Sequence, residues 1–246
     1  MSHIDIRRDL KAAYSRAWPV MIAYVFMAIA FGLSLNQAGF NVVWAGVISV
    51  IVYAGSLQFA LVGFLAAGTA VTTAAVLALL LNARHMFYGI SFIERFRKNK
   101  KAYPYMIFSL TDETYSVLLA DTWPEGVNEA RADFFLALMN HLSWILGSVI
   151  GALAGALIPL DFAGVEFSMT ALFMIIFLNQ WKEQKQHFPA ICGLVSAAVF
   201  LAILGPDHFI LPSLIVSVLI ILIFQAIPQS LNPNSGKGGD PHADHI

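Results

Sequence analysis

The stretch AWPVMIAYVFMAIAFGLSL, residues 17–35, contains nineteen residues and no charged side chain. About 18 or more predominantly apolar residues are enough for a helix to cross the ~30 Å hydrocarbon core of a membrane. Further apolar segments follow at 42–67, 69–92, 104–120, 134–159, 168–181, 188–204 and 209–227. The sequence therefore predicts an all-α polytopic membrane protein with about seven transmembrane helices.

The composition supports this class. Of the 246 residues, 59% are hydrophobic and 12% are charged, whereas a soluble domain carries roughly a quarter charged residues. The single cysteine, Cys192, lies in an apolar segment, which argues against a disulfide framework or a thiolate metal cluster. Phosphate-loop, dinucleotide and zinc motifs are absent, as is a basic nucleic-acid patch. We therefore expect no cofactor, no metal, no nucleic-acid partner and no enzymatic activity.

Positive charge predicts the topology. Nine of the fourteen Lys and Arg residues lie before Trp18 or within Glu94–Lys101, and both regions should be cytoplasmic. No small-residue cleavage site follows the first apolar segment, so we interpret it as a retained span. The predicted organisation is a cytoplasmic segment at 1–16, one transmembrane domain at 17–228 and a disordered tail at 229–246.

Three simple crossings between the two basic regions would place the second outside the cell. The conflict disappears if segment 42–67 enters and leaves the membrane on one side. YAGSLQF, Tyr53–Phe59, has Gly55 and Ser56 near the middle of that segment, and both residues favour a helix break. We expect a broken or re-entrant segment whose half-helices meet at Gly55. Because irregular backbone at membrane depth is tolerated only along a protein-buried or watery cavity, a break here predicts a functional site.

Polar residues interrupt two other apolar segments. Arg84 follows Asn82 and precedes His85, where it either extends to the lipid interface or balances charge beside a polar cavity. Asp112 and Glu113 lie in SLTDETYSVLLAD, where they either favour the start of a helix capped by Ser109 or Thr111, or form part of a functional site. The two interpretations of the acidic pair are compatible.

The segment 134–159 carries two further patterns. Asn140 and His141 lie near its start, where a histidine is either a hydrogen-bonded packing residue or part of a proton relay. Small residues spaced four apart on one helix face allow close approach of a second helix, from this chain or another. The glycines with this spacing are Gly147, Gly151 and Gly155.

Three stretches together resemble the AzlC family, the large subunit of two-component branched-chain amino-acid exporters. They are YAGSLQFALVGFLAAG from Tyr53, LNARHMFYG from Leu81 and LTDETYSVL from Leu110, and the resemblance extends over residues 18–227. It implies export of valine, leucine or isoleucine across the bacterial cytoplasmic (inner) membrane. It also implies a small hydrophobic partner subunit of the AzlD type.

An amino-acid zwitterion needs donors for its carboxylate, acceptors for its ammonium group and an apolar pocket. Broken helices supply the first two through half-helix N-termini and unwound carbonyls. The residues that we expect to bind substrate are Tyr53, Gly55, Ser56, Gln58, Phe59, Asn82, Arg84 and His85. The residues that we expect to couple transport or relay charge are His85, Asp112, Glu113 and His141.

Two alternatives to a transporter remain open at this stage. Ser56 at a break and His85 on another span could form the dyad of an intramembrane hydrolase, although the sequence lacks the G-x-S-x-G motif. Alternatively, the chain could be an assembly subunit that transports nothing, with polar residues that only pack.

Overall fold

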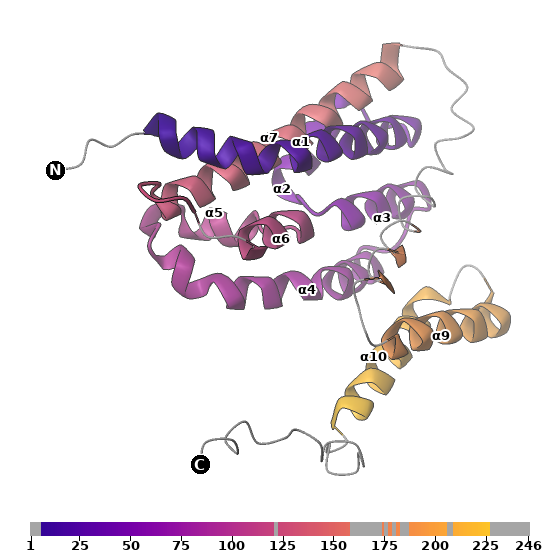
Figure 1. The fold of residues 1–246 in the computed structure, drawn as a ribbon. Helices are drawn as coiled ribbons and strands as arrows, with labels where there is room; N and C mark the ends of the chain where they lie inside the picture. The colour runs from indigo at the N-terminus through magenta and orange to yellow at the C-terminus, as the bar shows by residue number, and fades with distance from the viewer. Residues whose placement is uncertain are drawn as a thin grey trace, which may run out of the picture. The chain divides into compact units, whose positions relative to one another are not determined.

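The computed structural model describes residues 6–120, 123–157, 174, 177–178, 181–182, 187–205 and 209–226. The helices are α1 (Ile6–Gln37), α2 (Val42–Ile51), α3 (Gly55–Ala66), α4 (Val71–Arg97), η1 (a 3₁₀ turn, Lys100–Ala102), α5 (Tyr103–Phe108), α6 (Asp112–Ala120), α7 (Glu129–Leu157), α9 (Phe188–Leu204) and α10 (Ile210–Ala226) (Figure 1). No strand occurs among these described residues, and the predicted all-α class is confirmed. The chain forms two compact units, Met1–Ile176 and Phe177–Ile246.

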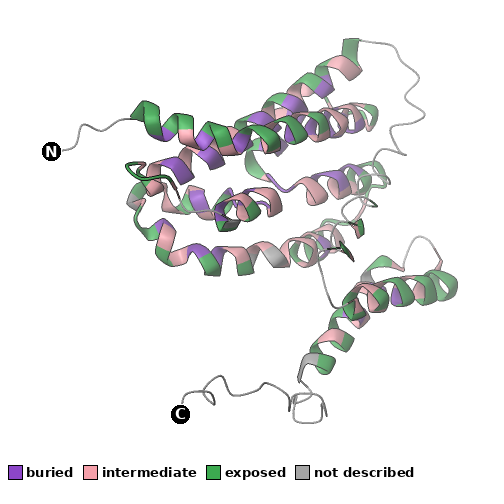
Figure 2. Ribbon diagram, viewed as in Figure 1, coloured by how far each residue is buried: buried purple, intermediate pink, exposed green. Residues whose placement is uncertain are grey.

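Helix length and exposure fit a polytopic membrane protein. Helices α1 and α7 are long and apolar enough to span a membrane, and α4 has two halves inclined at 61°, Val71–Ala83 and Phe87–Arg97. Shorter apolar helices are α2, α3, α9 and α10. Large apolar side chains such as Phe26, Leu79 and Phe87 are exposed, and Figure 2 shows such exposed positions along the outer faces of the helices. A bilayer is the solvent that favours this surface. The polytopic class predicted from the sequence is therefore confirmed.

Helices α1 and α7 pack along a stripe of small residues. A Cβ atom added to Gly151 would lie 2.1 Å from the carbonyl oxygen of Ile29, and one added to Gly32 would lie 2.1 Å from that of Ser148. Gly147 faces Val25 of α1 in the same way, and Gly155 faces Asn36. The glycine face of α7 thus lies against α1 of the same chain, where the absence of side chains brings the two backbones together.

The segment 42–67 is broken, as predicted, but not at the predicted residue. Tyr53 has a φ of 35°, a left-handed conformation that is unusual for a bulky side chain. Residues 52–54 separate α2 from α3, and Gly55 is already the first helical residue. The expectation that the half-helices meet at Gly55 was therefore wrong by two residues. Gly55 serves another purpose, because a Cβ atom there would lie only 3.0 Å from Cη2 of Trp144.

The expected apolar segment 104–120 is also broken, between α5 and α6. Residues 109–111 form the break. The hydroxyl of Thr111 accepts a hydrogen bond from the backbone N–H of Thr114 at 3.3 Å, so Thr111 caps α6 as one interpretation of the sequence proposed. Asp112 and Glu113 lie in the first turn of this helix, where the helix dipole favours negative charge.

The broken pair α2–α3 enters the bundle from one end. Gly46 of α2 lies beside Val149 of α7, and the carbonyl of Ser49 bonds to His141, so α2 runs toward the start of α7. Helix α3 then runs back, because Tyr53 contacts Tyr24 of α1 and Phe59 contacts Phe31. The pair is a re-entrant hairpin, as its sequence predicted.

The pair α5–α6 is a second hairpin that enters from the opposite end. Helix α5 runs from the level of Phe134, which contacts Tyr105, to that of His141, which contacts Phe108. Helix α6 then returns to the end at which α5 begins, where the carbonyl of Leu118 bonds to Arg95. Figure 1 shows the short helices between the α1–α7 pair and α4. The two breaks consequently meet in the middle of the bundle.

This topology predicts the side on which α4 ends. In a Cys192→Ala background, a membrane-impermeant maleimide should label Arg97→Cys from the cytoplasmic side only, because Arg97 is exposed and lies within the second basic cluster. Ala70→Cys, at the other end of α4, is the matched control and should be labelled from the periplasm. Labelling of Arg97→Cys from the periplasm alone would contradict the topology.

Candidate functional site

The two helix breaks meet at Tyr53. Its ring stacks on that of His141, with centroids 4.0 Å apart, and lies 6.2 Å from the ring of Phe108 at the end of α5. The Tyr53 hydroxyl faces those of Tyr24 and Thr114, although neither is within hydrogen-bonding geometry. This buried aromatic contact holds the unusual backbone of Tyr53 in place, since a strained conformation persists only where its surroundings impose it.

A chain of hydrogen bonds connects α1, α6 and α7 at the same level. The Tyr24 hydroxyl donates to Oε2 of Glu113 at 2.7 Å and also contacts the hydroxyl of Thr111. Thr111 donates to the Thr114 hydroxyl at 3.0 Å, and the side-chain amide of Asn140 donates to the same oxygen at 3.1 Å. Glu113 is thereby linked through hydroxyl groups to the interior of α7.

We call the region around Tyr53, where the two breaks meet, the polar centre. His141 lies in this centre and has a partner for each ring nitrogen. Nε2 lies 3.2 Å from the carbonyl oxygen of Ser49, and because a carbonyl can only accept, Nε2 carries a proton. Nδ1 lies 3.2 Å from the Tyr105 hydroxyl, which donates to it when the ring is neutral. These contacts match the packing interpretation of His141, and a relay role stays a prediction.

Four buried polar atoms at this centre have no hydrogen-bond partner. They are the Tyr53 hydroxyl, Oε1 of Gln58, Oδ1 of Asn140 and Nε1 of Trp144. Tyr53 and Trp144 are 3% exposed, and Gln58 and Asn140 are 0% exposed. Buried polar groups are nearly always paired, and each unpaired one costs about 1–3 kcal/mol. Each of these atoms therefore needs a further partner, which water or a ligand can supply.

A separate cluster links α4 with α6. The Tyr88 hydroxyl donates to Oδ1 of Asp112 at 2.8 Å, and the ring of His85 packs edge-on against that of Tyr88 at 5.6 Å. Oδ1 of Asn82 is buried without a hydrogen-bond partner. Asp112 and Glu113 thus face different helices, although they are adjacent in sequence. The Arg84 side chain lies outside the described residues, as does its predicted proximity to Asp112.

The remaining predicted substrate residues lie on α3. Nε2 of Gln58 donates to the Ser49 hydroxyl at 3.3 Å, and Phe59 is buried against Phe31. Gly55 and Ser56 form the first turn of α3, directly after the break. The structure therefore brings Tyr53, Gly55 and Gln58 together around the centre, while His85 and Asp112 belong to the second cluster.

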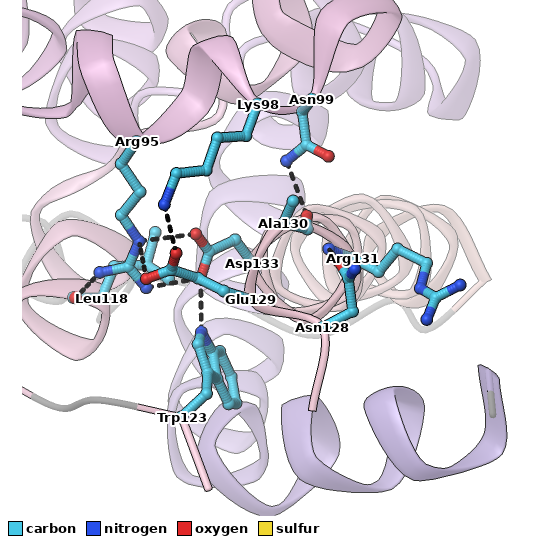
Figure 3. A network of polar contacts seen from close by, with 10 residues as sticks. All are labelled: Arg95, Lys98, Asn99, Leu118, Trp123, Asn128, Glu129, Ala130, Arg131 and Asp133. Carbon is cyan, nitrogen blue, oxygen red and sulfur yellow. Dashed lines mark hydrogen bonds and ion pairs between the residues drawn. The ribbon is translucent and has the colours of Figure 1, made fainter. Parts of the chain in front are cut away.

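An ion-pair network connects the helices at the end of the bundle where α4 ends and α7 begins (Figure 3). Nε and Nη2 of Arg95 each lie 2.7 Å from one oxygen of Asp133, which also accepts from Nε1 of Trp123 at 2.7 Å. The same arginine donates to the carbonyl of Leu118. Arg131 binds the buried Asp9 of α1 close by, at 2.7 Å. These contacts join α1, α4, α6 and α7.

Sequence reasoning missed several residues of the centre. Tyr24 and Trp144 read as apolar aromatic residues, and Thr111 and Thr114 as a helix cap, so nothing in their local pattern indicated a shared site. Asp133 stands directly before the apolar segment 134–159. An acidic residue at a span boundary is a signal that could have suggested a buried ion pair.

Comparison with known proteins defines the class to which this helical bundle belongs. The model of the AzlC protein family matches residues 19–158. The chain is 34% identical over 218 residues to the Bacillus subtilis branched-chain amino acid transport protein AzlC, covering 87% of this chain and 86% of that one. The chain belongs to the AzlC family.

Other relatives share most of their length with this chain. An uncharacterized membrane protein of Helicobacter pylori is 36% identical over 221 residues, covering 90% of this chain and 97% of its own. The inner membrane protein YgaZ of Escherichia coli is 30% identical over 234 residues, covering 87% and 91%. No solved structure matches. Membership of this family and the apolar helices together make the chain a membrane protein of a transport family.

Proposed function

We propose that this chain is the large subunit of a secondary transporter that exports valine, leucine and isoleucine across the bacterial cytoplasmic membrane. The observation that carries the proposal is the polar centre where two opposing hairpins meet, with four buried polar atoms that lack partners. Backbone breaks at membrane depth line substrate sites in transporters built from broken helices. The relative from Bacillus subtilis, named a branched-chain amino acid transport protein, supports this substrate class.

The proposal includes a partner and an orientation. The partner is a small hydrophobic membrane subunit of the AzlD type, and the N-terminus of α1 faces the cytoplasm. Substrate passes the residues of the α3 start, Gly55, Ser56 and Gln58, on a path bordered by α4 residues Arg84 and His85. Coupling charge is carried by the acidic pair Asp112 and Glu113, with the histidines His85 and His141 as further candidates.

Reconstituted efflux tests the proposal. Liposomes containing this chain and its small partner should release preloaded radiolabelled leucine, whereas Arg84→Lys and Asp112→Asn should each reduce the rate by about 10-fold or more. Lysine lacks the planar donor fork of arginine, and the Asp112 carboxylate accepts the Tyr88 bond. The loss of one such charge-assisted bond corresponds to this factor.

Two substitutions elsewhere serve as matched controls for that assay. Arg97→Lys and Glu125→Gln change the same groups at exposed positions and should leave efflux unchanged. Near-normal efflux from both site variants, at matched protein amounts, would reduce the charged cluster to a structural role. If the wild-type pair moves no branched-chain amino acid, the transporter proposal itself fails.

The hydrolase alternative is decided by another assay. His85 packs against Tyr88, and Ser56 lies in the first turn of α3. A labelled transmembrane peptide that is cleaved by the wild type and not by Ser56→Ala would favour the enzyme. An assembly subunit, in contrast, would neither cleave the peptide nor support efflux.

A further inference from the structure

We infer that the centre holds both charged ends of an amino-acid zwitterion, with Trp144 and the start of α3 at its carboxylate, Glu113, Asn140 and Gln58 at its ammonium group, and the Tyr53 hydroxyl between the two. The inference rests on the proposed function and names the atoms that recognise the substrate. It follows from the chemistry of the four unpartnered atoms and from the helix end that lies beside them.

The donors gather at the N-terminus of α3. This helix has twelve residues, and its N-cap residue Ala54 makes no side-chain capping bond. The first N–H groups of a helix have no intrahelical acceptor, and its N-terminus attracts negative charge. The six-membered ring of Trp144 lies against Gly55 of this turn, and Nε1 of that tryptophan can only donate. Tyr53 directly precedes the turn, and its unpartnered hydroxyl faces Tyr24 and Thr114. A carboxylate suits the N-terminus of α3 and Nε1 of Trp144.

The acceptors are oriented by bonds that the same side chains already make. The amide nitrogen of Gln58 donates to Ser49, and that of Asn140 donates to Thr114. In this arrangement Oε1 of Gln58 and Oδ1 of Asn140 are buried without partners. Glu113 is connected to Asn140 through the hydroxyls of Tyr24, Thr111 and Thr114 and adds a negative charge to this side. An ammonium group, with three donors and no acceptor, suits this side.

The two groups of atoms lie on adjoining turns. Asn140 and Trp144 are four residues apart on α7 and thus on one face of that helix, while Tyr53 and Gln58 flank the first turn of α3. Tyr24 packs edge-on against both Tyr53 and Trp144, with ring centroids 6.4 and 5.3 Å away. A water molecule can satisfy single atoms of this set, but a zwitterion matches a separate group of donors and group of acceptors.

Ligand analogues that lack one charged end test the assignment. On the purified complex in lipid nanodiscs, displacement of radiolabelled leucine is measured with leucine, isoamylamine (no carboxylate) and 4-methylpentanoate (no ammonium). Trp144→Phe should weaken leucine binding by about 10-fold or more and leave isoamylamine unchanged. Glu113→Gln should weaken leucine and isoamylamine and leave 4-methylpentanoate unchanged. Equal weakening of all three ligands by either variant, or unchanged leucine affinity in both, would overturn the assignment.

Thermal unfolding without ligand separates recognition from packing. Tyr53→Phe removes only a hydroxyl that has no partner and should leave the midpoint temperature unchanged or raise it, whereas Trp144→Phe also removes packed ring atoms and should lower it. Tyr24→Phe is the matched control and should lower the midpoint, because its hydroxyl has two partners. A marked loss of stability in Tyr53→Phe would show that its hydroxyl serves the fold and would overturn the assignment.

The outcomes also separate this assignment from the proposed function. If neither analogue displaces leucine from the wild type, the assignment is tested by the leucine affinities and the unfolding midpoints of the variants. If the wild-type complex binds and transports no branched-chain amino acid, the proposed function fails. Leucine binding that Trp144→Phe and Glu113→Gln leave intact overturns the assignment alone.

Discussion

Gly151→Leu should yield no folded, monodisperse protein, since the new side chain collides with the backbone of α1. A Cβ atom at this position would lie 2.1 Å from the carbonyl oxygen of Ile29 and 2.8 Å from its Cα atom. Flexible side chains can move aside, but two helical backbones can relieve such a contact only by separating. Even Gly151→Ala should therefore destabilise the protein, although it adds one methyl group. Size-exclusion chromatography of the detergent-solubilised protein measures the result.

The matched control for this substitution is Gly63→Leu. Gly63 is also helical and exposed, but a Cβ atom there would meet nothing within 4 Å, so the same change should leave the elution profile intact. A monodisperse Gly151→Leu protein with full efflux would contradict the close contact between α1 and α7. Because glycine is replaced by leucine at both positions, a difference between the two variants reports how closely a second helix packs at each position.

Arg95→Met should lower the free energy of unfolding by about 3–5 kcal/mol, because it leaves the carboxylate of Asp133 buried without its counter-charge. Both oxygens of this 0%-exposed carboxylate are held by Arg95. Only the tryptophan N–H of Trp123 would remain as a described side-chain donor to it. Denaturation of the purified protein, followed by loss of tertiary signal, measures the change.

Lys98→Met is the matched control for Arg95→Met. The Lys98 side chain is 63% exposed and pairs with Glu129 at 2.9 Å, so its loss should cost no more than about 1 kcal/mol. The double variant Arg95→Met/Asp133→Leu should recover part of the stability that Arg95→Met loses, since it removes the stranded charge. Equal, small losses in Arg95→Met and Lys98→Met would show that the buried pair contributes little.

The all-α membrane class and the approximate positions of the helix breaks could be predicted from local sequence. The length of an apolar segment is set by bilayer thickness, and glycine spacing along α7 depends only on the helical repeat. The sequence therefore predicted the membrane class, the broken segment around Tyr53–Phe59 and the small-residue face at Gly151. The cap of α6 followed in part from the same reasoning, which offered Ser109 or Thr111, because a cap bonds to its own helix three residues later.

Other features depend on residues far apart in the chain. The break falls at Tyr53 rather than Gly55 because His141, 88 positions later, stacks on the tyrosine ring, which local propensity cannot anticipate. Asp112 and Glu113 are equivalent by composition, yet one bonds to Tyr88 of α4 and the other to Tyr24 of α1. Which buried polar atoms lack a hydrogen-bond partner likewise depends on the hydrogen bonds that neighbouring groups already make. Apolar length and helical period are local properties and so determine the class, whereas the polar centre exists only once two hairpins from opposite ends have brought their breaks together.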